Sequence, residues 1–139
     1  MEKSHDTFAD LSRGTSVWFT LSARVLPLGL LTQFLSAGSA LFHDQTLWGL
    51  HGAVGGALSV PVLALLAGAV FIPRLRGFGW WAGLTCLLYL TQIVLAAGGS
   101  LLPLSLHPMN GALLLASSLV LLAKVERRRA QPLPERILS

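Results

Sequence analysis

Two histidines, each followed by a glycine four residues later, stand at the head of two apolar stretches of this sequence. His51 and Gly55 lie in "WGLHGAVGGAL", and His107 and Gly111 lie in "LSLHPMNGALL". A neutral imidazole is a common metal ligand, and among hydrocarbon it costs free energy unless it is hydrogen-bonded or bound to a metal. The pattern therefore indicates a ligand site to which two imidazoles contribute.

The glycines fit such a site and also fit a simpler explanation. On a helix, residue i+4 lies on the same face one turn further along, so Gly55 and Gly111 would leave room for a flat ring beside each imidazole. Small residues equally let helices pack closely, and Gly52 and Gly56 form a Gly-x-x-x-Gly pattern. Packing explains the glycines, but it does not explain a histidine at the same place in both stretches.

The composition indicates that these histidines lie in a lipid bilayer. Of the 139 residues, 53% are hydrophobic and 12% are charged, and the mean hydropathy is +0.67. Soluble globular domains have about 25% charged residues. The net charge of +4 comes from lysines and arginines near the two ends and in one short link, so no basic face could follow a nucleic acid backbone. We expect a membrane protein and no nucleic acid partner.

Four apolar stretches are long enough for helices that cross a bilayer, which takes about 20 residues. The short links between them make neighbouring helices antiparallel. We predict an all-α membrane protein, an up-down-up-down four-helix transmembrane bundle that forms a single domain over residues 1–139. Its spans are expected at roughly 17–42, 48–72, 78–100 and 106–123. The fourth is the shortest, so its helix is expected to begin a few residues earlier, and Pro61 should bend the second helix.

Lysines and arginines predict the orientation. They lie before or at the start of the first span, in the second link, and after the fourth span. The positive-inside rule then places both termini on the cytoplasmic side of a bacterial inner membrane and both histidine motifs near the outer face. Arg24 either snorkels to the headgroups or marks the true start of the first span. The small residues "SAGSA" also resemble a signal-peptide cleavage site, but we treat this segment as a retained span.

An internal repeat relates the two histidine motifs. "LLTQFLSAGSALF" aligns with "YLTQIVLAAGGSLL", which matches Gln33 with Gln92, and each glutamine precedes a histidine by 18 or 15 residues. The chain thus reads as two repeated helical hairpins related by a pseudo-twofold axis along the membrane normal. Such symmetry would bring His51 and His107 to the same depth across the axis of the bundle.

Two imidazoles facing each other across a bundle core can be the axial ligands of one haem iron. Cys86 is the single cysteine, which excludes covalent attachment through a Cys-x-x-Cys motif. We therefore expect one noncovalent haem b per chain, with His51 and His107 as metal ligands and Gly55 and Gly111 against the ring. In the alternative interpretation, the histidines lie solvated at the outer headgroup level.

The remaining polar residues of the spans have two interpretations each. Gln33 and Gln92 either hydrogen-bond each other, which we favour, or contact a substituent of the ring. Asn110 either bonds to the outer link or orients an imidazole. His43 and Asp44 could bind a metal or a haem propionate, but a solvated pair is favoured.

The sequence resembles a family of small bacterial four-helix membrane proteins of unknown function over roughly residues 20–125. The motifs that carry the resemblance are "Gln33-x-x-x-Ala37-Gly38-x-x-x-Phe42", His-x-x-x-Gly and "Leu106-His107-Pro108-x-Asn110-Gly111". This implies the fold but no activity. More distantly, the layout is similar to one half of haem A synthase, which holds haem between histidines of the second and fourth helices. That likeness implies axial ligation by His51 and His107. It does not extend to haem hydroxylation, because Trp48 stands where the synthase has a glutamate.

Two classes of function are consistent with the sequence. The first is a small b-type cytochrome that transfers single electrons near the outer face, with a membrane oxidoreductase or a quinone as partner. The second is a cofactor-free accessory or assembly subunit of a larger respiratory-type membrane complex. A homo-oligomer is compatible with either class. A stand-alone enzyme is disfavoured, since a hydrolase would need a nucleophile motif such as Gly-x-Ser-x-Gly, and transport is disfavoured because the spans lack carboxylates.

Overall fold

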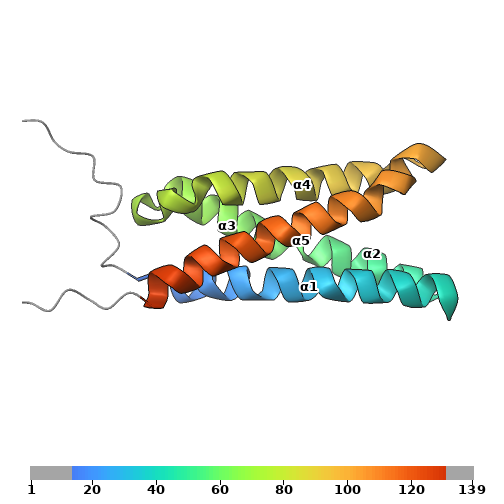
Figure 1. The fold of residues 1–139 in the computed structure, drawn as a ribbon, viewed down its shortest axis with the longest axis horizontal. Coiled ribbons are helices and arrows are strands. Elements are labelled where there is room, and N and C mark those ends of the chain that lie inside the picture. The colour runs from blue at the N-terminus through green and yellow to red at the C-terminus, as the bar shows by residue number, and fades with distance from the viewer. Residues whose placement is uncertain (1–13, 131–139) are drawn as a thin grey trace, which may run out of the picture.

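A computed structural model describes residues 14–130, and all the regular structure in this range is helical (Figure 1). Four helices are long and apolar enough to cross a membrane, and they cover Val17–Phe42, Leu47–Phe71, Pro73–Ala97 and Leu101–Ala130. The predicted all-α four-helix transmembrane bundle is thereby confirmed. The protein is a multi-pass membrane protein with a lipid bilayer as its surroundings.

The four crossings alternate in direction, so each end of the bundle contains a different set of links and helix ends. In chain order the elements are α1 (Val17–Phe42), α2 (Leu47–Ala57), α3 (Ser59–Phe71), the 3-10 helix η2 (Pro73–Phe78), α4 (Gly79–Ala97) and α5 (Leu101–Ala130). The start of α1, η2 and the end of α5 share one end, here called the η2 end. The links 43–46 and 98–100 share the other, here called the histidine end (Figure 1).

The second crossing is interrupted close to Pro61, where a bend was predicted. Helix α2 ends at Ala57 and α3 begins at Ser59. Pro61 has no N–H group, so the helical hydrogen bond to the carbonyl of Ala57 cannot form. Leu58, at the break, is buried, and it lies where a side chain on Gly29 of α1 would otherwise be. The break therefore brings α1 and the second crossing into close contact.

The helix of the fourth span begins five residues before the predicted limit at 106, in agreement with the expectation of an earlier start. Helix α5 begins at Leu101, because Pro103 lies in the first turn, where a helix does not use the backbone N–H. The link is reduced to residues 98–100, and Gly99 has a φ of +61°, which glycine adopts without strain. With 30 residues, α5 is about 45 Å long. It therefore exceeds the roughly 30 Å hydrocarbon core.

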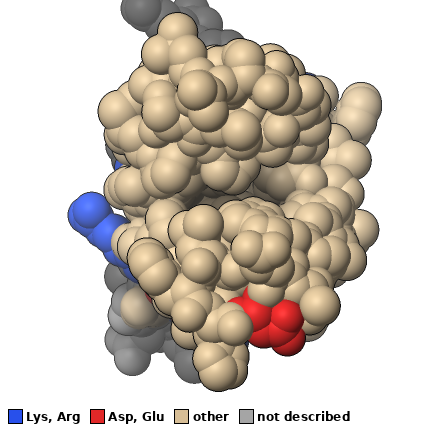
Figure 2. Space-filling model, turned by 90° about the vertical axis from the view of Figure 1, so that its right-hand side faces the viewer, with Lys and Arg blue, Asp and Glu red and all other residues tan. Residues whose placement is uncertain are grey.

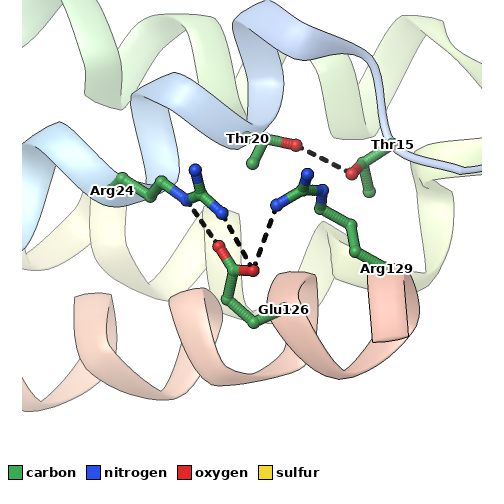
Figure 3. A network of polar contacts seen from close by, with 5 residues as sticks. All are labelled: Thr15, Thr20, Arg24, Glu126 and Arg129. Atoms are coloured by element: carbon green, nitrogen blue, oxygen red, sulfur yellow. Dashed lines mark hydrogen bonds and ion pairs between the residues drawn. The ribbon is translucent and has the colours of Figure 1, made fainter. Parts of the chain in front are cut away.

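Arg24 has a partner that neither interpretation of this residue included. Its guanidinium donates two hydrogen bonds to the carboxylate of Glu126 on α5, at 2.6 and 3.1 Å. Arg129 donates to the same carboxylate at 3.2 Å (Figure 3). Helix α1 begins at Val17, so Arg24 does not mark its start. Glu126 lies beyond the predicted end of the fourth span, and only the folded bundle places it beside Arg24.

Close packing at the η2 end depends on a glycine of α3. Phe19 of α1 is fully buried, and its ring centroid lies 5.4 Å from that of Phe78. A Cβ on Gly68 would come within 2.7 Å of both the Phe19 and the Trp18 rings. Small residues permit this approach of two membrane helices, for which lipid provides no hydrophobic driving force.

We predict that Gly68→Ala destabilises the bundle by about 1–3 kcal/mol, because the added methyl group overpacks a buried aromatic cluster. The shift is measured as the midpoint of thermal unfolding in detergent micelles. Gly56→Ala is the matched control, since a Cβ there meets nothing within 4 Å. Equal midpoints for both variants would contradict the packing described here.

Candidate functional site

The structure brings the two predicted histidines together. His51 projects from α2 and His107 from α5, and both side chains are partly buried. Their ring centroids are 6.3 Å apart, and the ring planes are inclined by 60°. Two positions separated by 56 residues of sequence therefore form one pair of imidazoles.

Each imidazole is bonded to the backbone of the glutamine in its own repeat. His51 Nδ1 lies 3.2 Å from the carbonyl oxygen of Gln33, and His107 Nδ1 lies 3.2 Å from the carbonyl oxygen of Gln92. A carbonyl oxygen accepts, so each Nδ1 must carry the proton and each Nε2 keeps a lone pair. This arrangement is typical of metal-binding histidines, which donate their other ring N–H to a carbonyl or carboxylate.

The imidazoles line a pocket between the α1–α2 pair and the α4–α5 pair. The volume open to the centres of water molecules is about 80 Å³. Gln33, Gln92 and Gly111 share the lining with apolar residues such as Phe34 and Pro108. Figure 2 looks onto the histidine end, where a hollow lies between the two halves of the molecule. Charged side chains are almost absent from this face, so the pocket is set in largely apolar surroundings.

The favoured hydrogen bond between Gln33 and Gln92 is not formed among the described residues. Gln92 Nε2 lies 3.0 Å from His107 Nε2, and Gln92 Oε1 accepts a 2.6 Å hydrogen bond from Asn110 Nδ2. Gln33 Nε2 is buried and has no hydrogen-bond partner within residues 14–130. The prediction was wrong because α5 presents His107 and Asn110 one turn apart, and together they engage both ends of the Gln92 amide.

Asn110 holds the Gln92 side chain in place. It does not bond to the outer link, which was one of its two interpretations. It is buried, and its Nδ2 also donates to the carbonyl oxygen of Leu88 on α4 at 2.9 Å. It thus fixes the Gln92 amide, which in turn contacts His107. Of its two interpretations, the structure favours the one in which Asn110 orients an imidazole.

Each predicted glycine faces the glutamine of its own repeat. A Cβ on Gly55 would come within 3.0 Å of Gln33 Oε1, and a Cβ on Gly111 within 3.1 Å of Gln92 Nε2. The space that the sequence assigned to a flat ring therefore contains the ends of two flexible amide side chains. A ring could lie against the glycines only after these amides had moved aside.

The donor set fits a haem better than a bare metal ion. Imidazole nitrogen binds a first-row metal at about 2 Å, so rings on opposite sides of one ion have centroids on the order of 6 Å apart, close to the 6.3 Å observed. Among residues 14–130 no group of three or more His, Cys, Asp or Glu side chains could hold a metal ion. A metal already held by a macrocycle needs only the two imidazoles. A ring would also need more room than the pocket of about 80 Å³ provides. Admitting one would require the α1–α2 and α4–α5 pairs to separate as well as the Gln33 and Gln92 amides to move aside.

Three contacts of the site were not foreseen from the sequence. Ser36 Oγ lies 3.1 Å from His51 Nδ1, and the Trp48 ring meets the His51 ring edge to face at a centroid distance of 5.5 Å. The Tyr89 hydroxyl donates to the carbonyl oxygen of Gly55 at 2.9 Å. Helical spacing is a signal for the first two, since Ser36 follows Gln33 by three residues and Trp48 precedes His51 by three. The Tyr89 hydrogen bond connects α4 with α2, and no helical spacing in the sequence predicts it.

His43 and Asp44 lie outside the pocket. Both are exposed in the link between α1 and α2. Asp44 accepts hydrogen bonds from the Thr46 backbone N–H at 2.9 Å and from the Thr46 hydroxyl at 2.8 Å. These two bonds stabilise the carboxylate and lower the pKa of Asp44. The pair therefore lies in a solvated turn, as was favoured, and His43 is a histidine of the same end without contact to the site.

We predict that Asn110→Ala destabilises the bundle by about 1–3 kcal/mol, because the buried Leu88 carbonyl and Gln92 Oε1 lose a donor. The free energy of unfolding is measured by denaturant titration in mixed micelles. Ser105→Ala is the control on the same helix, since the exposed Ser105 hydroxyl bonds only locally to Leu102. A loss no larger than that of the control would show that Asn110 does not hold the network.

Residues 33–99 match the profile of a family described as a family of unknown function (DUF6220). The match includes Gln33, His51, Gly55 and Gln92 and ends before His107. Neither a curated protein nor a solved structure matches the chain. The chain is thus similar to a family of unknown function through its first histidine motif and both glutamines, and the site itself must carry any functional conclusion.

Proposed function

We propose that this protein is a small membrane b-type haem protein that transfers electrons, with one noncovalent haem b between His51 and His107. The observation that carries the proposal is the repeated hydrogen bond from each Nδ1 to the glutamine carbonyl of its own repeat. It orients both rings and leaves the lone pair of each imidazole on Nε2. The His107 lone pair would become a ligand only after Gln92 Nε2 had moved away from it. Bound haem would supply a one-electron couple, whose potential depends on ligation, burial and nearby hydrogen bonds.

The surrounding residues would orient and shield such a group. The Gln92 carbonyl oxygen would hold the His107 ring, and Ser36 and Trp48 would hold the His51 ring. The apolar lining would exclude water once the Gln92 amide had moved aside. His51 and His107 lie within the first two turns of α2 and α5, near the histidine end, so electrons would pass to a membrane oxidoreductase or a quinone there. The positive-inside rule makes this the outer side of a bacterial inner membrane, with cytoplasmic termini.

A cofactor-free accessory or assembly subunit is the second candidate, and two observations favour it. Gln92 Nε2 already lies against His107 Nε2, so this imidazole has a protein partner at both nitrogens. Gly49, Gly52 and Gly56 also present open space where a side chain would be, which suits a helix of a larger complex. The two candidates differ in whether the purified protein contains a redox centre.

The first test is an absorption spectrum of the purified protein, oxidised and then reduced with dithionite, with a pyridine haemochrome assay of stoichiometry. We expect a Soret band that shifts on reduction and about one haem per chain, as for a bis-histidine cytochrome. His51→Ala and His107→Ala should each abolish the low-spin signal, and His43→Ala should leave it unchanged. A colourless protein that stays so after haem is supplied would favour the accessory subunit. Full retention of the signal in both site variants would overturn the ligand assignment.

A second prediction tests the place of the ring. Gly55→Leu and Gly111→Leu should lower the haem content several-fold while the protein still inserts, because a leucine side chain would fill the space beside each imidazole. Haem per chain and membrane-fraction yield are measured together. Gly56→Leu is the control next in sequence, since its Cβ would meet open space. Equal loss of yield in the three variants would indicate helix packing as the role of these glycines.

A further inference from the structure

The charges of the described residues are divided unequally between the two ends of the bundle. Within residues 14–130 the acidic residues are Asp44, at the histidine end, and Glu126, near the η2 end. Glu126 is held by Arg24 and Arg129 on the side of α5 that faces α1 (Figure 3). The positive charge on the opposite side of α5, toward η2, is therefore not balanced by Glu126.

The end of α5 is attached to η2 through Arg128. This buried side chain donates from Nη1 to the carbonyl oxygen of Arg74, and its guanidinium carbon lies 5.4 Å from the centroid of the Phe78 ring. Lys124 precedes Arg128 by four residues and so projects from the same face one turn earlier. Arg74 and Arg76 belong to the η2 segment that Arg128 contacts, and Lys124 lies one turn before Arg128 on α5. These three residues are here called the basic corner.

Arg74 has a donor that the described protein does not use. Its Nε is buried and has no hydrogen-bond partner within residues 14–130. A buried guanidinium donor without a partner costs free energy, and a guanidinium binds phosphate oxygens through a planar fork of N–H groups. Because this Nε is buried, a phosphate reaches it only when the Arg74 side chain turns outward, which breaks no hydrogen bond at Nε. The basic corner thus offers positive charge and, after that movement, an unused donor for a phosphate group.

Exposed aromatic residues on either side of η2 indicate the depth of the basic corner in the membrane. Phe71 immediately precedes η2 in the chain and is 79% exposed, and Trp80 immediately follows it and is 76% exposed. Tryptophan is enriched where the hydrocarbon of a bilayer meets the headgroups, so Trp80 indicates this level, and the exposed Phe71 ring would lie in the adjacent hydrocarbon. The basic corner therefore lies at the depth of the phospholipid phosphates rather than in the aqueous phase.

We infer that the basic corner binds the phosphodiester of an anionic phospholipid. Arg74 and Arg76 contact the phosphate oxygens, Lys124 adds charge beside them, and Arg128 holds η2 and α5 together behind the headgroup. The lipid attaches to the protein at the η2 end, away from the histidine pocket. Its binding does not depend on the presence of haem.

The test compares spin-labelled phosphatidylglycerol with spin-labelled phosphatidylcholine in phosphatidylcholine vesicles containing the full-length protein. The fraction of motionally restricted label gives a relative association constant. We expect phosphatidylglycerol to associate several-fold more strongly, and Arg74→Gln with Arg76→Gln to lower its constant by about fivefold for each arginine. Arg76→Gln alone, at an exposed position, covers the case in which the double variant does not fold.

The control removes the same charge elsewhere at this end. Arg127→Gln with Arg129→Gln, outside the basic corner, should keep the preference for phosphatidylglycerol. If both double variants lost the same fraction of the phosphatidylglycerol association constant, the preference would reflect surface charge in general, and the proposed site would be overturned. Absence of any preference in the unmodified protein would also overturn it. Displacement of the label by excess inorganic phosphate at constant ionic strength would assign the corner to free phosphate instead of lipid.

Discussion

The hydrogen bond from each histidine Nδ1 to a glutamine carbonyl is the constraint on which the site depends. The largely apolar lining of the pocket offers an imidazole few hydrogen-bond partners, so each ring is satisfied by a group of the bundle itself. Each partner is a helical carbonyl oxygen, which has a second lone pair to offer. The same bond at 3.2 Å in both hairpins sets the ring orientation, and through it the 6.3 Å separation of the two imidazoles.

The rest of the polar network follows from the same scarcity of partners. Asn110 and His107 engage the two ends of the Gln92 amide, and Tyr89 donates to the carbonyl of Gly55 beside the break at Leu58. Gln33 is the exception, with a buried amide nitrogen that has no partner in the described residues. Both halves of the repeat therefore have the same hydrogen bond from histidine to a glutamine carbonyl, but within residues 14–130 only the Gln92 side-chain amide is hydrogen-bonded. The Gln33 side of the pocket is thus the easier one to rearrange.

The two ends of the bundle perform different physical tasks. The histidine end is closed by short links, is almost uncharged, and contains a pocket between two helix pairs. The η2 end contains buried aromatic packing around Phe19 and Phe78 and a charge network centred on Glu126. The proposed ligand site at one end and the proposed lipid contact at the other are separated by an apolar interior, so neither requires the other.

The sequence by itself determined the number of crossings, their approximate limits and the repeat of glutamine, histidine and glycine, since hydropathy and periodicity are local properties of the chain. It also indicated that His51 and His107 would approach one another, because a repeated hairpin implies symmetry. It did not determine the partners of Gln92, Asn110 and Arg24, or the start of α5 at Leu101. Those depend on which side chains of other helices arrive at the same depth and face, and only the packed bundle decides that.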